Sequence, residues 1–215
     1  MVVKNNKEKL FTICGIIKES FPNPETELNY DSEFNLLVAI ILSAQTTDRM
    51  VNIATKPLFQ KIKTPQDILK IDKIELLDYL KILNYYKTKT ENIIKMANQV
   101  MQNYNGKIPD NFEDLITLAG VGRKTANVFL NIAHNKPTIA VDTHVFRVKN
   151  RIFGKNFTKP EQTEEFLLGL NNHKLADLTH HLLILHGRYV CRAIKPDCVN
   201  CKIKNHCIFY QKKEI

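Results

Sequence analysis

The chain has 215 residues, 44% of them hydrophobic, which is enough for one sizeable packed domain or two smaller ones and excludes a disordered chain. Lysine and arginine outnumber aspartate and glutamate by 31 to 22, and the resulting charge of +9 favours a polyanionic partner. No apolar run approaches the roughly 20 residues that cross a bilayer, and the basic N-terminus lacks an apolar stretch of signal-peptide length. We therefore expect a cytoplasmic protein with no membrane partner.

In chain order, the first apolar pattern combines Leu10, Phe11 and Ile17 with Cys14, whose thiol we expect to be buried and inert. The next, residues 36–42, is uninterruptedly apolar and predicts a helix buried on nearly all sides. A polar string, residues 43–48, follows it. This string fits a helix cap with a solvated turn, or a loop that aims Gln45 at a ligand.

Helix signals then recur with almost no strand signals, and they predict about ten helices in an all-α fold. The N-cap candidates are Thr64 before Pro65, Asp72 with Glu75, Thr88 with Glu91, and Asp110 with Glu113.

Between two of these helices, Asn84 is suited to a left-handed C-cap and is followed by two tyrosines. Exposed tyrosines beside lysines suit base stacking, and the alternative is that Tyr85 and Tyr86 pack on the neighbouring helix.

The segment 118–124 places Gly120 and Gly122 on either side of a valine, between expected helices over 110–117 and 123–133. Without a Cβ to block the approach, backbone N–H groups at a helix N-terminus can meet a phosphate, and Arg123 adds positive charge. The spacing also fits a plain corner between helices, in which the glycines serve packing alone. Our interpretation is a helix-hairpin-helix over about residues 112–131.

Two reactive side chains follow this turn, Lys124 at the start of one helix and Asp142 at the start of the next. A primary amine held beside nucleic acid suits attack on a sugar carbon and formation of an imine. The carboxylate would orient the amine, stabilise developing positive charge and carry protons. The simpler alternatives are a phosphate-binding or solvated lysine and an aspartate that only caps its helix.

The C-terminal tail contains a cluster of four cysteines with the spacing C-x6-C-x2-C-x5-C: Cys191, Cys198, Cys201 and Cys207. Four thiolates in one short loop indicate a metal site, either tetrahedral zinc or an iron–sulfur cluster. Zinc modules usually pair two C-x-x-C units, and this tail has only one. Arg192 and Lys195 lie between the first two cysteines, where a basic loop can reach backbone phosphates.

Taken together, residues 118–131 and 137–144 match the signature of the endonuclease III family nearly residue by residue, and the similarity runs from about Phe34 to the last cysteine. The resemblance implies that Lys124 is the nucleophile and Asp142 its partner. It also implies removal of an oxidised pyrimidine, a Schiff base at the anomeric carbon, and strand cleavage by β-elimination. The cysteine spacing resembles the family's loop for one 4Fe-4S cluster.

The same resemblance implies that Gln45 fills the gap left by the extruded nucleotide and that a second loop supplies an apolar wedge. Here Tyr85 stands where relatives often have leucine. Two further departures are Ala119 in place of the usual proline and a loop, residues 134–137, without its customary glycine. None of these changes removes a reactive group.

We therefore expect the helix-hairpin-helix glycosylase fold, with a six-helix barrel over 26–136, a cluster domain from 1–25 and 137–215 with its cluster loop at 191–207, and a DNA cleft between them. The expected partner is duplex DNA with damaged bases or abasic sites. The expected protein is a monomer with no obligate protein partner, associated with the nucleoid through DNA. His144 joins the expected DNA contacts.

Two alternatives stay open at this point. One is a non-catalytic DNA-binding module that uses the hairpin as a phosphate clamp. The other is the adenine-removing branch of the same superfamily, which usually lacks the hairpin lysine and needs an acid on the early buried helix. Residues 34–45 contain no acid.

Overall fold

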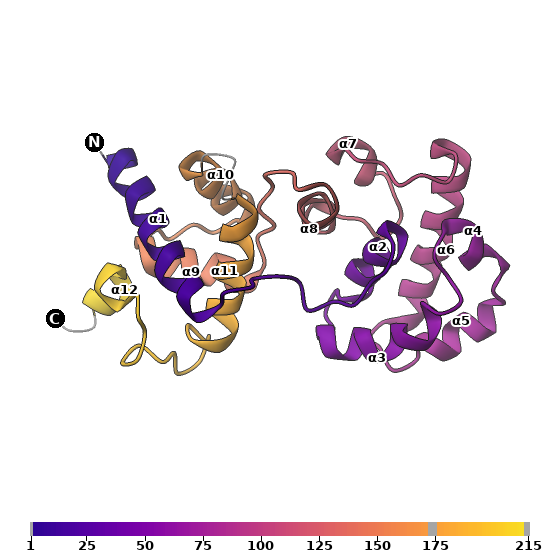
Figure 1. Ribbon diagram of the computed structural model, residues 1–215, viewed down its shortest axis with the longest axis horizontal. Helices are drawn as coiled ribbons and strands as arrows, with labels where there is room; N and C mark the ends of the chain where they lie inside the picture. The colour runs from indigo at the N-terminus through magenta and orange to yellow at the C-terminus, as the bar shows by residue number, and fades with distance from the viewer. Residues whose placement is uncertain (1, 172–175, 213–215) are drawn as a thin grey trace. The chain divides into compact units, whose positions relative to one another are not determined.

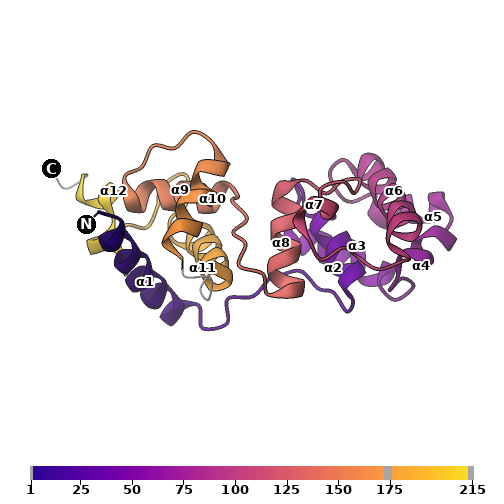
Figure 2. The same cartoon turned by 90° about the horizontal axis from the view of Figure 1, so that it is seen from above.

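The computed structural model describes residues 2–171 and 176–212, and within these ranges the chain is helical with no strand, which confirms the all-α prediction. The chain forms two compact units, Glu27–Asn135 and the segments on either side of it (Figures 1 and 2). The assignment of a six-helix barrel to 26–136 and of a cluster domain to the remainder stays a prediction. Among the described helices, none has the length and apolarity required to cross a membrane.

The unit of residues 27–135 is built around helix α2 (Glu33–Leu42), and α3, α6 and α8 all pack against it (Figures 1 and 2). All residues from 34 to 42 are buried, which confirms the prediction of a helix enclosed on nearly all sides. The other helices of this unit are α3 (Asp48–Leu58), α4 (Pro65–Lys70), α5 (Lys73–Leu80), α6 (Tyr86–Tyr104), α7 (Phe112–Leu115) and α8 (Arg123–His134).

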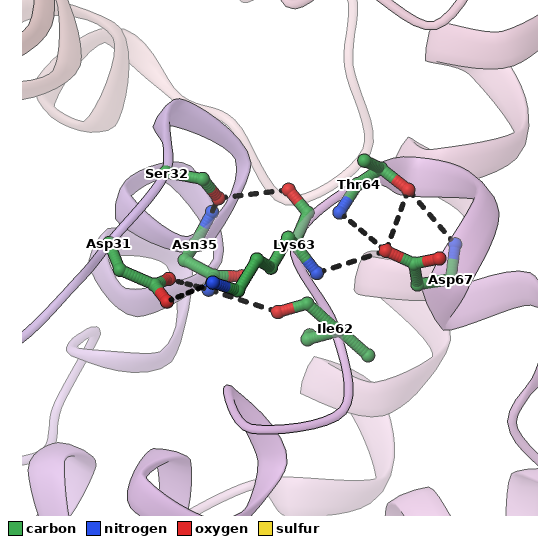
Figure 3. A network of polar contacts seen from close by, with 7 residues as sticks. All are labelled: Asp31, Ser32, Asn35, Ile62, Lys63, Thr64 and Asp67. Carbon is green, nitrogen blue, oxygen red and sulfur yellow. Dashed lines mark hydrogen bonds and ion pairs between the residues drawn. The ribbon is translucent and has the colours of Figure 1, made fainter.

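A polar network fixes the start of α2 (Figure 3). Ser32 caps the helix by accepting from the Asn35 N–H at 3.1 Å, and its hydroxyl donates to the Lys63 carbonyl at 2.9 Å. The fully buried Asn35 amide donates to the Asp31 carboxylate and to the Ile62 carbonyl. Because buried polar groups are costly unless they are hydrogen-bonded, this network holds α2 in one position relative to the loop before α4.

The N-cap predictions divide into two that are confirmed and two that are wrong. Thr64 and Asp72 cap α4 and α5, and Pro65 occupies the first turn of α4. Thr88 lies inside α6, because the helix begins earlier, at Tyr86. Asn111 takes the place of Asp110 as the cap of α7, where it accepts from the Asp114 N–H at 2.8 Å.

The second unit contains α1 (Val2–Ser20), α9 (Thr143–Phe153), α10 (Pro160–Leu170), α11 (Ala176–Tyr189), the 3-10 helix η1 (Lys204–His206) and α12 (Ile208–Gln211). Helix α11 packs against both α9 and α1, and α12 packs against α9. Cys14 is buried in this core, and its burial raises the pKa of the thiol to about 11, as expected of an inert cysteine.

A second buried polar group in this unit is Lys149 of α9, which is fully buried. Its Nζ lies 3.5 Å from the centroid of the Phe157 ring and donates to Asn150 Oδ1 at 2.7 Å. Burial, with a smaller contribution from nearby Lys155, lowers the pKa of Lys149 to about 8.

Candidate functional site

The turn between α7 and α8 has the backbone of a hairpin. Gly120 takes a left-handed conformation with φ +78°, and Gly122 precedes the first residue of α8 in an extended conformation. Leu118 and Val121 point into the core, and the Val121 N–H donates to the Leu118 carbonyl at 3.0 Å. The turn therefore anchors itself with two apolar side chains while both glycines stay exposed.

Gln99 of α6 holds this turn in place from outside. Its Oε1 accepts from the Ala119 N–H at 2.7 Å, and its Nε2 donates to the Thr117 carbonyl at 3.1 Å. These two bonds satisfy the backbone on both sides of Leu118 and fix the hairpin to α6.

The position of Gly120 explains why that residue has no side chain. A Cβ there would lie 3.0 Å from Asn92 Cβ of α6 and 3.3 Å from Ile41 Cγ2 of α2. The turn thus sits directly against both helices, close to the end of α2.

Lys124 lies in the first turn of α8 and is exposed. The adjacent Arg123 is also exposed, and its guanidinium lies 5.1 Å from the centroid of the Phe112 ring. The first N–H groups of a helix have no intrahelical acceptor and carry the positive end of the helix dipole. An amine and a guanidinium therefore lie at one accessible helix start that carries the positive end of a dipole, which is an arrangement suited to a DNA phosphate and its sugar.

Gln45 and Tyr85 occupy two other loops of the same unit, and both take left-handed backbone conformations, with φ of 54° and 57°. Both side chains are exposed, with Tyr85 66% accessible. The left-handed residue is thus Tyr85, and the expectation of such a conformation at Asn84 was wrong. Asn84 instead donates its side-chain amide to the Gln45 carbonyl at 2.8 Å, which links the two loops.

Asp142 and His144 belong to the other unit. Asp142 caps α9 by accepting from the Val145 N–H at 2.8 Å. The capping role that the sequence suggested for this aspartate is therefore confirmed. The cap bond uses Oδ1, one of the two carboxylate oxygens, and the residue is partly exposed. A capping aspartate is held rigidly, which also suits a catalytic partner.

Arg147, which no sequence pattern singled out, organises the surroundings of His144. Its guanidinium donates to His144 Nδ1 at 3.1 Å, to the Gly187 carbonyl at 3.0 Å and to the Cys191 carbonyl at 3.0 Å. Since arginine can only donate, Nδ1 of His144 accepts and Nε2 carries the ring proton. His144 therefore offers an N–H donor, the type of group that binds a phosphate oxygen.

The four cysteines of the tail line a single pocket together with apolar side chains that include Ile152, Val190 and Ile203. Burial raises the pKa of Cys207 and raises that of Cys201 to about 11, so a nearby cation is needed to keep them as thiolates. In residues 2–171 and 176–212, no three His, Cys, Asp or Glu side chains are gathered for a single metal ion. The donors surround a pocket and do not converge on one point.

Side chains outside the cysteine loop support it. Arg151 donates to the Cys191 sulfur at 3.3 Å and to the Arg192 carbonyl at 2.8 Å, and its guanidinium lies 4.7 Å from the Phe209 ring centroid. The Arg192 and Lys195 side chains are exposed on the loop, as a phosphate-binding role requires.

Two buried lysines of the protein had a signal in the sequence. Lys89 and Lys149 each stand at an apolar position of an amphipathic helix, where a charged residue is unusual, and both prove to be buried. Gln99 and Arg151 had no such signal, because their partners lie far away in the sequence, and the same is true of the bonds from Arg147 to Gly187 and Cys191.

Comparison with known proteins identifies relatives over nearly the whole chain. Residues 38–172 match the family model of the HhH-GPD superfamily of base excision DNA repair proteins. The chain is 49% identical over 198 residues to endonuclease III of Rickettsia conorii, covering 92% of this chain and 94% of that one. It is 46% identical over 213 residues to endonuclease III of Escherichia coli, covering 98% and 100%.

Solved structures with the same fold include a trapped endonuclease III–DNA covalent intermediate. It matches with a TM-score of 0.90 at 36% identity, covering 97% of this chain and 99% of that one. A non-covalent endonuclease III–DNA complex also has a TM-score of 0.90 at 36% identity, covering 97% and 98%.

Proposed function

Because the chain belongs to the endonuclease III family of base excision DNA repair proteins, we propose that it excises oxidised pyrimidines from duplex DNA and then cleaves the abasic strand. The observation that carries this proposal is the exposed Lys124 amine at the start of α8, directly after the hairpin. A relative of this fold has been trapped as a covalent intermediate with DNA, which is the state that a nucleophilic lysine produces.

In the proposed reaction, the Lys124 amine attacks the anomeric carbon of the damaged nucleotide, and the bond to the base breaks. The base departs with the electron pair of that bond and takes up a proton. Loss of a proton from the nitrogen and opening of the sugar ring give a Schiff base. Removal of a proton from the adjacent sugar carbon then expels the 3′ phosphate by β-elimination, and water releases the lysine.

Asp142 is proposed to orient the amine, to stabilise the positive charge that develops on the sugar and to carry protons between steps. Its fixed position as the cap of α9 supports this role. The Nε2 donor of His144 and the N–H groups around Gly120, Gly122 and Arg123 are proposed to bind the phosphates that flank the lesion.

The damaged nucleotide must leave the helical stack before the amine can reach it, at a cost of a few kcal/mol that a lesion lowers. We propose that Gln45 and Tyr85 fill the gap. The exposure of both side chains, on loops linked by the bond between the Asn84 amide and the Gln45 carbonyl, supports this role. An aromatic ring can stack on bases of any sequence, so tyrosine can take the place of an apolar wedge.

The four tail cysteines are proposed to hold one 4Fe-4S cluster. All four cysteines line one pocket, so their thiolates would hold the cluster there. Ligation by these four residues would stabilise the shape of the 191–207 loop. Arg192 and Lys195 would then face backbone phosphates, and the protein would act as a cytoplasmic monomer on the nucleoid.

Borohydride reduction tests the proposed chemistry directly, because it converts a Schiff base into a stable bond between protein and DNA. The expected result is a covalent adduct with an abasic or thymine-glycol duplex, lost in Lys124→Gln with duplex binding retained. Lys95→Gln, which changes an exposed lysine of α6, is the matched control and should trap normally. Binding without any adduct or cleavage would refute the proposal and favour a non-catalytic DNA-binding module.

A further inference from the structure

One buried lysine, Lys89, joins the loop that carries Gln45 to α6, the helix that begins directly after Tyr85. Its side-chain Nζ donates to the Leu42 carbonyl and to the Thr46 hydroxyl, each at 2.8 Å. These two acceptors lie at the end of α2 and in the loop that contains Gln45. Tyr85 is the N-cap of α6, one helical turn before Lys89, and its carbonyl accepts the helical hydrogen bond from the Lys89 main-chain N–H at 3.0 Å.

Lys89 makes its contacts with Leu42 and Thr46 from a buried position. The residue is 5% exposed, and burial lowers the pKa of its amine. The Leu42 carbonyl belongs to the last turn of α2, where carbonyl groups lack intrahelical donors and a cation is favoured. The lysine therefore satisfies an orphan acceptor and anchors a loop at the same time.

A second hydrogen bond links the Gln45 loop to the Tyr85 loop. Asn84, next to Tyr85, donates its amide to the Gln45 carbonyl at 2.8 Å. Left-handed backbone conformations in residues other than glycine persist only where the surrounding structure holds them. Around Gln45, the surrounding contacts include the Asn84 amide on its carbonyl and the Lys89 amine on the neighbouring Thr46 hydroxyl.

We propose that Lys89 is a positioning residue that fixes these two loops as one rigid element, so that Gln45 and Tyr85 enter the DNA stack together. The inference rests on the proposed function, in which both residues fill the gap left by an extruded nucleotide. Loops ordered before binding lose little further conformational freedom when they insert, whereas separate loops would each have to be ordered on the DNA.

The test compares two substrates that differ in whether a stack must be opened. Lys89→Met keeps the apolar stem and removes the ammonium. On a duplex with a paired lesion, we expect turnover to fall by about tenfold to a hundredfold, the effect of one lost charge-assisted hydrogen bond. On a single-stranded abasic oligonucleotide, where there is no stack to open, we expect cleavage to be unchanged.

A fluorescent base analogue placed beside the lesion gives a readout that a merely structural role would not move. Its fluorescence rises when the neighbouring base leaves the stack, and we expect this rise to be lost in Lys89→Met. Lys149→Met, which removes the other buried lysine, is the matched control and should leave both the fluorescence and the ratio of the two activities unchanged.

Coupling between the residues provides an independent check. If Lys89 acts through Gln45, then Lys89→Met should lower turnover on the duplex by a much smaller factor in a Gln45→Ala background than in the native protein. Thr46→Val, which removes only the hydroxyl acceptor, should move the duplex activity in the same direction. If Lys89→Met melts below the assay temperature, the activity of Thr46→Val on the two substrates tests the positioning role in its place.

The outcomes separate this inference from the proposed function. If the native protein forms no borohydride adduct, the proposed function fails. If the native protein traps normally while Lys89→Met and Thr46→Val lower duplex and single-strand cleavage equally, or lower neither, the positioning role is overturned.

Discussion

Close packing between α9 and α11 makes Gly187 the most informative single substitution in the unit that carries Asp142. A Cβ added at this position would lie 2.7 Å from His144 Cβ and 3.3 Å from His144 Cα. Carbon atoms make favourable contact at about 3.5–4.0 Å, so Gly187→Ala requires the two helices to separate by about 1 Å. Because one of the obstacles is main chain, the start of α9 must move, and Asp142 with it.

Such overpacking costs about 1–3 kcal/mol, and the better helix propensity of alanine offsets up to about 1 kcal/mol of it. A net loss of about 1–2 kcal/mol lowers the melting temperature by about 2–8 °C in a protein of this size. A displacement of about 1 Å in a catalytic group, the role proposed for Asp142, can slow a reaction on the order of a hundredfold. We therefore expect a modest loss of stability with a large loss of borohydride trapping.

Gly169→Ala is the matched control, because Gly169 also lies in a helix of the same unit and its added Cβ meets nothing within 4 Å. We expect this variant to gain about 0.5–1 kcal/mol from helix propensity and to trap at the native rate. Melting curves and single-turnover trapping measure both effects. If Gly187→Ala melts and traps like Gly169→Ala, the packing argument for α9 is wrong.

The remaining predictions concern Lys149, Gly120 and the cysteines. The folded-state pKa of Lys149, about 8, lies below the unfolded value of 10.5. The unfolded chain therefore binds the extra proton between these pH values, and stability rises with pH across that window. Lys149→Met should remove this rise and should be more stable than the native protein at pH 7 by roughly 1–3 kcal/mol. If the unfolding free energies of the variant and the native protein change with pH in parallel, this prediction is wrong. Gly120→Ala adds a Cβ at φ +78° and 3.0 Å from Asn92 Cβ. We expect this variant to lose about 1–3 kcal/mol of stability and to bind duplex more weakly in gel-shift titrations. A native melting temperature with native binding would contradict this prediction. Cys198→Ala should abolish the broad visible absorption expected of the purified protein, and a colourless native protein containing zinc would refute the cluster.

Local patterns in the sequence predicted much of the fold, and they placed Lys124 in the first turn of one helix and Asp142 at the start of the next. The burial of α2 follows from an apolar run with no polar face, and the hairpin follows from two glycines between helix signals. Such features depend on neighbours a few residues apart, which the sequence displays directly.

Features that depend on distant residues could not be predicted in this way. The contact of Lys89 with Leu42 spans 47 positions in the chain, and the bond between Arg147 and the Gly187 carbonyl spans 40. Tyr85 takes a left-handed backbone conformation although tyrosine has no local preference for it, so the sequence pattern pointed to Asn84 instead. In the sequence, Lys89 appears only as a charged residue on an apolar helix face, which does not indicate its partner.

The central claim, that Lys124 forms the covalent bond to the sugar, is tested most directly by mass spectrometry of the borohydride-reduced complex. Digestion of the adduct formed on an abasic duplex should yield one modified peptide, with the sugar remnant on Lys124. A remnant on any other lysine, or strand cleavage by the native protein without any adduct, would contradict the account.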